Sequence, residues 1–324
     1  MTFENASVVK TAMQFWGKIT AADANKGSIE AGAGSSIVLS DTSIFRNISL
    51  ADATSKLILN SANANFTLSS VTLGSAGAGE LNIDRAGKLI AGAGTLDFGT
   101  RDKAAGKVRF ENDVALTLAN GVNIWANKLE SNVNGTGSLV FEGTSVFSAK
   151  NTAANRINTI TVANAGNATI MEDMYTVGNV VLAPNATLDA KGKLNTGAGG
   201  STDVQNDATL KVGSDLTTAA VSIAANANMQ VEGNLTTAGN VIMATGSTLR
   251  TAGNVTGSIN AFGGADNGTW KFENNALATV AGQVGNANVL KAIEFAGTGD
   301  VTFNAKVEHT GKFTFKAGAG DIKV

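Results

Sequence analysis

The chain has 324 residues, of which 43% are hydrophobic, 15% are charged and 6% are aromatic, and its formal net charge is −2. This charge-poor composition excludes the basic patch with which nucleic-acid-binding proteins follow a phosphate backbone. The lack of cysteine excludes disulfides, iron–sulfur clusters and thiolate zinc sites, while 38 glycines beside a single proline indicate turns made by glycine and asparagine.

Targeting and membrane segments are not evident in the sequence. The first residues, MTFEN, carry no cationic segment followed by an apolar run, so no secretory signal is predicted. No stretch approaches the roughly 18 apolar residues of a membrane-spanning helix. If the protein is exported, we expect these residues to be an internal piece of a longer chain.

The first thirty residues are the least regular. Apolar side chains within Val8–Ile19 recur at helical spacing, which predicts one short amphipathic helix. They are Val8, Ala12, Phe15, Trp16 and Ile19. We interpret residues 1–30 as a cap over the open end of a repeat array, or as the cut edge of a longer chain. A partner-binding helix is the alternative.

Short alternating segments follow one another from Ile37 to Phe110 and predict strands of four to six residues. They read SIVLS, SKLILN, NFTLSS, ELNID, KLIA, TLDFG and KVRF. Between Glu111 and Met174 the spacing is looser. The connections are too short for helical crossovers, so these strands fit stacked coils better than alternating strand–helix units.

The stretch from Asn179 to Gly257 contains a nine-residue frame four times. The copies are VVLAPNATL, TDVQNDATL, VSIAANANM and VIMATGSTL, which begin at Val180, Thr202, Val221 and Val241. The third and ninth positions are apolar in every copy, which predicts two core columns. The sixth position is Asn185, Asp207, Asn226 or Gly246. These residue types tolerate a left-handed backbone, so this column predicts a turn.

The glycines that follow the four frames are 21, 20 and 20 residues apart. A period of this length, built from short alternating segments, predicts a parallel β-helix (β-solenoid) in which each coil of about 20 residues buries its apolar face on the next. We expect a continuous β-solenoid over residues 31–324, most regular over 179–257.

The frame weakens after Gly257 and returns at Ile293. We therefore expect Glu273–Ala292 to be an extended loop or a locally altered coil, and the most plausible place for specific binding. Phenylalanine is concentrated in the last sixty residues, which indicates wider coils or a stacked aromatic column; ordinary core packing is the alternative. These residues are Phe272, Phe295, Phe303, Phe313 and Phe315.

Residues with catalytic chemistry are sparse. The only histidine, His309, lies in a strand-like context that predicts an outward, solvated imidazole. The carboxylates that a β-helical glycan lyase or hydrolase would use are scattered; they include Asp84, Asp189, Asp203, Asp207, Asp215 and Glu232. A mixed outward ladder is expected from the tenth frame position, which is Asp189, Lys211, Gln230 and Arg250 in turn. We predict no catalytic, cofactor-binding or metal site.

The frames, taken with VGNANVLKAIEFAGTGDVTFNAKV (Val284–Val307), resemble the passenger region of rickettsial surface cell antigens, the outer-membrane protein B type of autotransporter. The similarity covers most of the chain and is most specific over Val284–Val307. It implies a right-handed β-helix stalk, export through a C-terminal barrel, and a role in host-cell adhesion and invasion or in a surface coat. The family provides no catalytic residues to transfer.

The functional expectation is a non-enzymatic bacterial surface fragment that acts as an adhesin, an invasin or a coat stalk. Its partners would be a host cell-surface protein or neighbouring copies of itself. It would be attached to a membrane only through a β-barrel that lies outside these residues. Two alternatives remain, namely a tailspike-like polysaccharide lyase or hydrolase and a purely structural spacer. Cleavage of acidic polysaccharides would indicate the lyase or hydrolase. Absence of saturable binding to cells would indicate the spacer.

Overall fold

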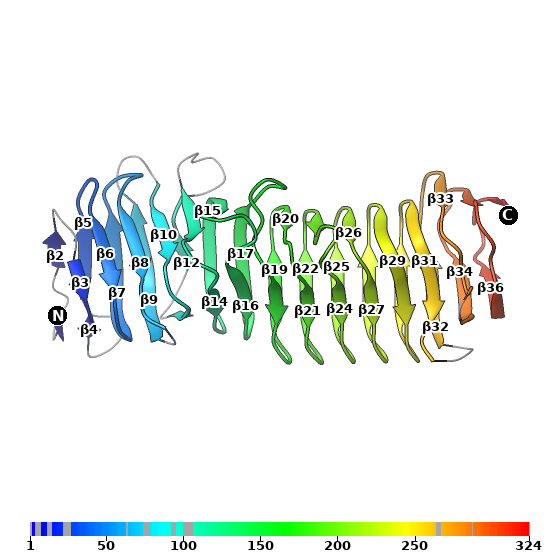
Figure 1. The fold of residues 1–324 in the computed structure, drawn as a ribbon, viewed down its shortest axis with the longest axis horizontal. Coiled ribbons are helices and arrows are strands. Elements are labelled where there is room, and N and C mark those ends of the chain that lie inside the picture. Colours follow the sequence, from blue (N-terminus) through cyan, green and yellow to red (C-terminus); the bar gives the residue numbers. More distant parts are fainter. Residues whose placement is uncertain are drawn as a thin grey trace. The chain divides into compact units, whose positions relative to one another are not determined.

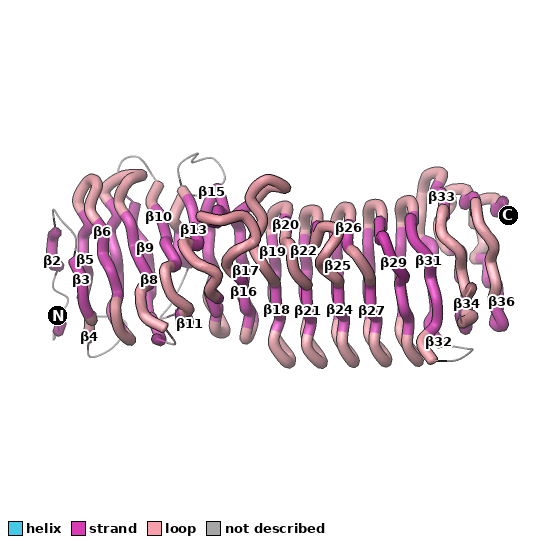
Figure 2. Tube along the Cα trace, viewed as in Figure 1, coloured by secondary structure: helices cyan, strands magenta, loops and turns pink. Residues whose placement is uncertain are grey.

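The computed structural model describes residues 2–3, 8–11, 15–21, 27–62, 64–73, 78–91, 95–99, 106–263, 267–286 and 288–323. This part of the chain is all-β with no helix, and its parallel strands stack in a β-solenoid of about 13 turns with about 21 residues per turn. Figure 2 shows the strands in magenta, separated by pink loops. The predicted parallel β-solenoid and its period are therefore confirmed.

The chain divides into two compact units. The first contains Met1–Ile160 and Asn167–Glu172, and the second contains Thr161–Gly166 and Asp173–Val324. In each unit the strands belong to two sheets, here called sheet A and sheet B. A regular coil contributes one strand to sheet A, the next to sheet B and a third to sheet A again.

Strands of the first unit pair in parallel from coil to coil. Its sheet A contains β1 (Thr2–Phe3), β2 (Val8–Thr11), β4 (Thr20–Ala21), β5 (Ser28–Ala31), β7 (Ser43–Leu50), β9 (Ala64–Leu73), β11 (Gly87–Ala91), β14 (Ala115–Leu118) and β16 (Ser138–Phe141). Its sheet B contains β3 (Phe15–Gly17), β6 (Ser36–Leu39), β8 (Lys56–Leu59), β10 (Glu80–Ile83), β12 (Thr95–Asp97), β13 (Lys107–Phe110), β15 (Asn123–Ser131), β17 (Thr144–Lys150) and β19 (Asn167–Ile170). The chain passes into the second unit within β18 (Ile160–Val162), returns to the first for β19, and leaves it after Glu172.

The second unit repeats the same order more regularly. Its sheet A contains β20 (Met174–Tyr175), β21 (Val180–Leu182), β23 (Leu194–Asn195), β24 (Thr202–Val204), β26 (Leu216–Thr218), β27 (Val221–Ile223), β29 (Leu235–Met243), β31 (Val255–Ala261), β33 (Ala278–Val280), β35 (Val301–Phe303) and β37 (Ile322–Lys323). Its sheet B contains β22 (Thr187–Ala190), β25 (Thr209–Val212), β28 (Asn228–Val231), β30 (Thr248–Thr251), β32 (Asn267–Phe272), β34 (Leu290–Phe295) and β36 (His309–Phe315). Figure 1 shows β21, β24 and β27 side by side in successive coils.

The N-terminal helix prediction is wrong. Val8–Thr11 forms β2, which pairs in parallel with β5, and Phe15–Gly17 forms β3, which pairs with β6. The intervening residues 12–14 lie outside the described residues. Helical spacing over so few residues is weak, whereas the β-branched run VVKT suits a strand once a neighbouring coil offers a pairing partner.

Strand register in the second unit follows the nine-residue frame. The first residues of the four frames pair in register from coil to coil. Val180 pairs with Thr202, Thr202 with Val221, and Val221 with Val241. The third and ninth frame positions are all at most 1% exposed, so both predicted core columns are confirmed. They are Leu182, Val204, Ile223 and Met243, and Leu188, Leu210, Met229 and Leu249. Each frame is therefore a strand, a turn and a second strand.

The sixth frame position has the predicted left-handed backbone. The φ angles are 60° at Asn185, 60° at Asp207, 58° at Asn226 and 72° at Gly246. Because a Cβ is strained in this conformation, short polar residues and glycine fill the column. The turn carries the chain from sheet A to sheet B in each of these coils.

Replacing Asp207 by valine is expected to lower the free energy of unfolding by about 1–2 kcal/mol, because a β-branched side chain is strained at positive φ. Asp207→Gly is the matched control and should change stability by about 0.5 kcal/mol or less, since glycine adopts this conformation freely. Urea denaturation followed by circular dichroism measures both. Equal midpoints for the two variants would contradict the assignment of strain to this position.

One carboxylate and two side-chain amides link successive coils just before the third strand of each coil. The Oδ1 atoms of Asp215, Asn234 and Asn254 accept hydrogen bonds from the backbone N–H groups of Asn234, Asn254 and Thr279, at 2.9, 2.9 and 2.8 Å. The bond from the Asn234 backbone, with help from Lys193, holds the pKa of Asp215 below its ordinary value despite partial desolvation. Asn234 and Asn254 therefore have a structural role as links between coils.

The last coils contain a stacked aromatic column that begins in their core and ends at Phe315, which is 57% exposed. The ring centroids of Phe272 and Phe295 are 5.7 Å apart and nearly parallel, and those of Phe295 and Phe315 are 5.3 Å apart. Phe303 meets Phe272 edge-on at 6.1 Å. Trp270, fully buried, lies 4.3 Å from Phe272. The concentration of phenylalanine seen in the sequence thus corresponds to a stacked column.

The segment Glu273–Ala292 is an altered coil rather than an extended loop. It includes β33, which pairs with β31 and β35, and the first residues of β34. Val284 bridges Ile259 and Val307 in the neighbouring coils. Backbone pairing thus continues through most of this stretch.

Candidate functional site

A groove lies on the outer face of sheet A in the second unit. Its floor is formed by Asp203 of β24, Ser222 of β27 and Ile242 of β29, which stand in register on successive coils. Each is flanked along its strand by buried residues, so the alternation of the strand turns these three side chains outward. The floor changes from acidic to polar to apolar along the coil axis.

Phe262 forms one wall of this groove. It follows β31, and its backbone N–H is bonded to the Met243 carbonyl at 2.8 Å. Its side chain is 65% exposed. Two adjoining hollows of about 830 and 380 Å³ share Ser222, Ile242 and Phe262 among their lining residues. Phe262 therefore borders both depressions of the sheet surface.

Short polar side chains complete the larger hollow. Asn179 and Ser201 directly precede β21 and β24, Asn240 lies within β29, and Asn288 comes from the altered coil. Asn179 Oδ1 accepts the Ser201 backbone N–H at 2.9 Å, which orients its amide. Asn288 anchors its own segment, because its carbonyl accepts the Ala261 N–H at 3.0 Å. The groove thus combines one aromatic ring with amides and hydroxyls that both donate and accept hydrogen bonds.

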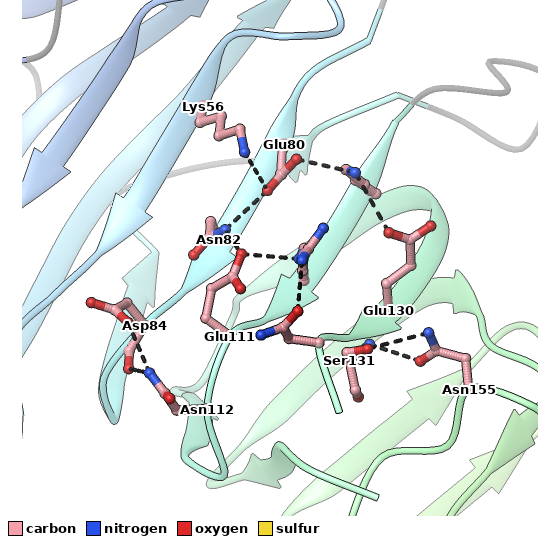
Figure 3. Close-up of polar contacts among 12 residues, drawn as sticks. Lys56, Glu80, Asn82, Asp84, Glu111, Asn112, Glu130, Ser131 and Asn155 are labelled. Carbon is pink, nitrogen blue, oxygen red and sulfur yellow. Dashed lines mark hydrogen bonds and ion pairs between the residues drawn. The ribbon is translucent and has the colours of Figure 1, made fainter. Parts of the chain in front are cut away.

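A second polar cluster lies in the first unit, on sheet B (Figure 3). Its centre is Glu80 of β10, whose side chain is 3% exposed. Lys56 of β8 and Lys107 of β13 stand in register on either side, with Nζ atoms 3.4 and 3.2 Å from the carboxylate. Asn82 Nδ2 donates to Glu80 Oε1 at 3.0 Å. A glutamate is therefore held between lysines of the preceding and following coils.

The ionisation of Glu80 follows from this setting. Burial alone would raise its pKa, but the Asn82 hydrogen bond and the charges of Lys107 and Lys56 outweigh desolvation and hold the pKa below its ordinary value. The paired lysines and the Asn82 amide thus favour the ionised carboxylate.

The surrounding charges of this cluster are also paired. Asn82 Nδ2 donates to Glu111 Oε1 at 2.7 Å, and Lys107 lies 3.5 Å from Glu130. Arg109 Nε lies 2.9 Å from Glu111 as an ion pair without hydrogen-bond geometry. The Lys56–Glu80, Glu80–Lys107 and Lys107–Glu130 contacts run between consecutive coils, so the cluster joins β8, β10, β13 and β15. The groove is the stronger candidate for ligand binding.

The predicted outward ladder is confirmed. Asp189, Lys211, Gln230 and Arg250 stand in register on sheet B of the second unit. Asp189 pairs with Lys191 at 2.6 Å. The coils also bring Asp189 and Glu232, distant in sequence, to the rim of one shallow depression of about 280 Å³.

The other residues considered from the sequence are dispersed. Asp203 lies in the groove, and Asp207 forms a turn. Asp84 accepts hydrogen bonds from Asn60 and, at 2.8 Å, from Asn112 in the first unit. His309 belongs to β36, and its side chain lies outside the described residues.

Sequence reasoning missed Phe262, Ser222 and Glu80. The loss of the frame after Gly257 was a signal near Phe262, but the exposure of its ring was not visible in the sequence. For Glu80, the sequence separation from Lys56 and Lys107 could have predicted the ion pairs. This separation can be interpreted only once the strand register between coils is known. Ser222 is one of many small residues in the repeat.

Comparison of the chain with protein-family models, curated proteins and solved structures finds no match. In the part of the chain that the structure describes, there is no helix long and apolar enough to cross a membrane. The same residues include no group of three or more histidine, cysteine, aspartate or glutamate side chains suited to hold a metal ion.

Proposed function

We propose that this chain is a non-enzymatic segment of a bacterial cell-surface protein, an autotransporter passenger that acts as an adhesin, invasin or coat stalk. The groove beside Phe262 is its ligand site. The observation that carries this proposal is a 65% exposed aromatic residue that borders two hollows on an otherwise regular outer face. Exposed aromatic groups in concave polar surroundings are typical of binding surfaces.

A binding role agrees with the chemistry of the groove. Hydrolysis of a glycosidic bond ordinarily uses two carboxylates on either side of the substrate. The residues that line the larger hollow include one, Asp203, beside several asparagines and serines. The parallel coils below supply a rigid platform because successive strands are hydrogen-bonded on both sides. We place the protein on the exterior of the outer membrane, where its partner is a host-cell surface component or another copy of itself.

Attachment of host cells to beads coated with the chain tests this function. Phe262→Ala is expected to reduce attachment roughly tenfold, as removal of a central aromatic anchor does at other interfaces. Leu277→Ala is the matched control, because Leu277 is 67% exposed in the same unit and does not line the groove. Circular dichroism verifies that both variants fold. Point variants are preferable to deletion of Glu273–Ala292, which would remove β33.

The result has clear alternatives. If host cells attach to beads coated with the unaltered chain no better than to bare beads, the chain would be a structural spacer rather than an adhesin. Equal losses in both variants would remove the groove from the adhesive surface. Cleavage of a polysaccharide by the purified chain would replace the proposal by an enzymatic function.

A further inference from the structure

The ligand class of the groove can be inferred from its lining, and this step rests on the proposed function. We propose that the groove over β24, β27 and β29 binds a linear, uncharged oligosaccharide, with one sugar ring stacked on Phe262.

The aromatic wall fits a sugar ring. Phe262 is exposed to solvent and borders both hollows, so a ring-shaped ligand in the groove can contact it. The carbon-bound hydrogens on one face of a pyranose ring form a flat apolar surface that packs on an aromatic face. Such packing removes the apolar area of Phe262 from water. Ile242 extends this apolar area along the floor.

The polar groups fit hydroxyls rather than charges. Ser222, Asn240 and Asn288 each present groups that donate and accept hydrogen bonds, which matches sugar hydroxyls, since these also do both. Among the described residues that line the larger hollow, Asp203 is the one that is charged, and its carboxylate accepts hydrogen bonds only. Its negative charge disfavours sulfated and uronic-acid glycans. The lining therefore selects an uncharged glycan.

The strands under the groove do not offer an edge to a peptide. β24 pairs with β21 and β27, β27 pairs with β24 and β29, and β29 pairs with β27 and β31. Their backbone groups are thus engaged within the sheet, whereas an extended peptide ordinarily binds by adding a strand to a free edge. Recognition here has to come from side chains, which suits a glycan.

The floor has the length of a short oligosaccharide. Its three side chains stand on three successive coils, and neighbouring parallel strands are about 4.8 Å apart, so the floor extends about 10 Å along the coil axis. The groove then accommodates two to three sugar rings of a linear chain, of which the one at Phe262 is the anchor.

Isothermal titration calorimetry on the full chain with cellotetraose, chitotetraose and lacto-N-neotetraose tests the proposal, with a heparin tetrasaccharide as the anionic comparator. We expect saturable binding of at least one uncharged tetrasaccharide and none of the heparin fragment. Phe262→Ala and Ser222→Leu should each weaken binding roughly tenfold or more, and Phe262→Trp should retain it. Asn228→Leu, an exposed change on β28 in the same coil but on the other sheet, is the control that should leave binding unchanged.

Three results would overturn this inference: no binding of any uncharged tetrasaccharide, binding of the heparin fragment alone, or binding that neither Phe262→Ala nor Ser222→Leu weakens. Failure of the adhesin role can be distinguished from failure of the glycan proposal. If cells attach through Phe262 but attachment survives periodate oxidation of their glycans and no tetrasaccharide binds, the adhesin role stands and the glycan is wrong. If tetrasaccharides bind but coated beads attach no cells, the glycan site stands and the adhesin role is wrong.

Discussion

Replacing Trp270 by alanine is expected to lower the free energy of unfolding by about 3–5 kcal/mol. Trp270 is fully buried and lies between the aromatic column and the preceding coil, where its Nε1 donates to Thr251 Oγ1 at 3.0 Å. Its removal leaves a cavity beside Phe272 and deprives a buried hydroxyl of its partner, and the two costs act together. Guanidinium denaturation measures the loss of stability. Unfolding is followed by circular dichroism of the backbone, because this signal does not come from the tryptophan that is replaced.

Trp270→Phe separates the two contributions. It keeps an aromatic ring next to Phe272 but removes the indole N–H, so its cost should be about 1–3 kcal/mol, which is clearly less than that of alanine. A Trp270→Ala variant within about 1 kcal/mol of the unaltered chain would show that the coil collapses around the gap. The aromatic column would then be dispensable for the stability of these last coils.

Replacing Glu80 by glutamine is expected to lower the free energy of unfolding at pH 7 by about 2–3 kcal/mol. Removal of one member of a buried ion pair ordinarily costs about 3–5 kcal/mol, and the value here is reduced because the lysines retain some contact with water. Lys56 and Lys107 are 36% and 25% exposed, against 3% for Glu80. Glu142→Gln is the control, since Glu142 and its partner Lys88 are 39% and 36% exposed and should contribute about 0–1 kcal/mol.

The stabilising effect of Glu80 should depend on pH in the acid range. Its pKa in the folded chain lies below the ordinary value of 4.5. The stabilisation is therefore fully present above pH 4.5 and is lost as the pH falls through the lower, folded-state pKa. In Glu80→Gln this acid-induced loss should be smaller. An unchanged difference between the two proteins from neutral to acid pH would show that Glu80 acts through its shape rather than its charge.

The turn residue Asp52 contributes to the same acid range. Hydrogen bonds from Thr54 and Ser55 lower the pKa of Asp52 to about 2. Its contribution is likewise present above its ordinary pKa and lost on acidification. The comparison of Glu80 with its glutamine variant removes this shared background, because Asp52 is common to both proteins.

The repeat columns show how much of the fold the sequence contains. Each frame places Leu182 and its equivalents inward and Asn185 and its equivalents at a left-handed turn, and both assignments hold in the structure. They could be predicted because strand alternation and the cost of a Cβ at positive φ act on local sequence. The helix predicted for Val8–Ile19 failed because a short pattern was outweighed by pairing with β5 and β6.

The candidate site depended on contacts between coils. Phe262 is distant in sequence from Asp203 and Ser222, and Glu80 is separated by whole coils from Lys56 and Lys107; only the stacking register brings each group together. By itself, then, the sequence determined the repeating coil, its core columns and its turns, because these follow from local backbone preferences and from apolar periodicity. The tertiary structure alone decided which outward side chains meet, because neighbours across coils are set by strand register and by where the repeat is broken.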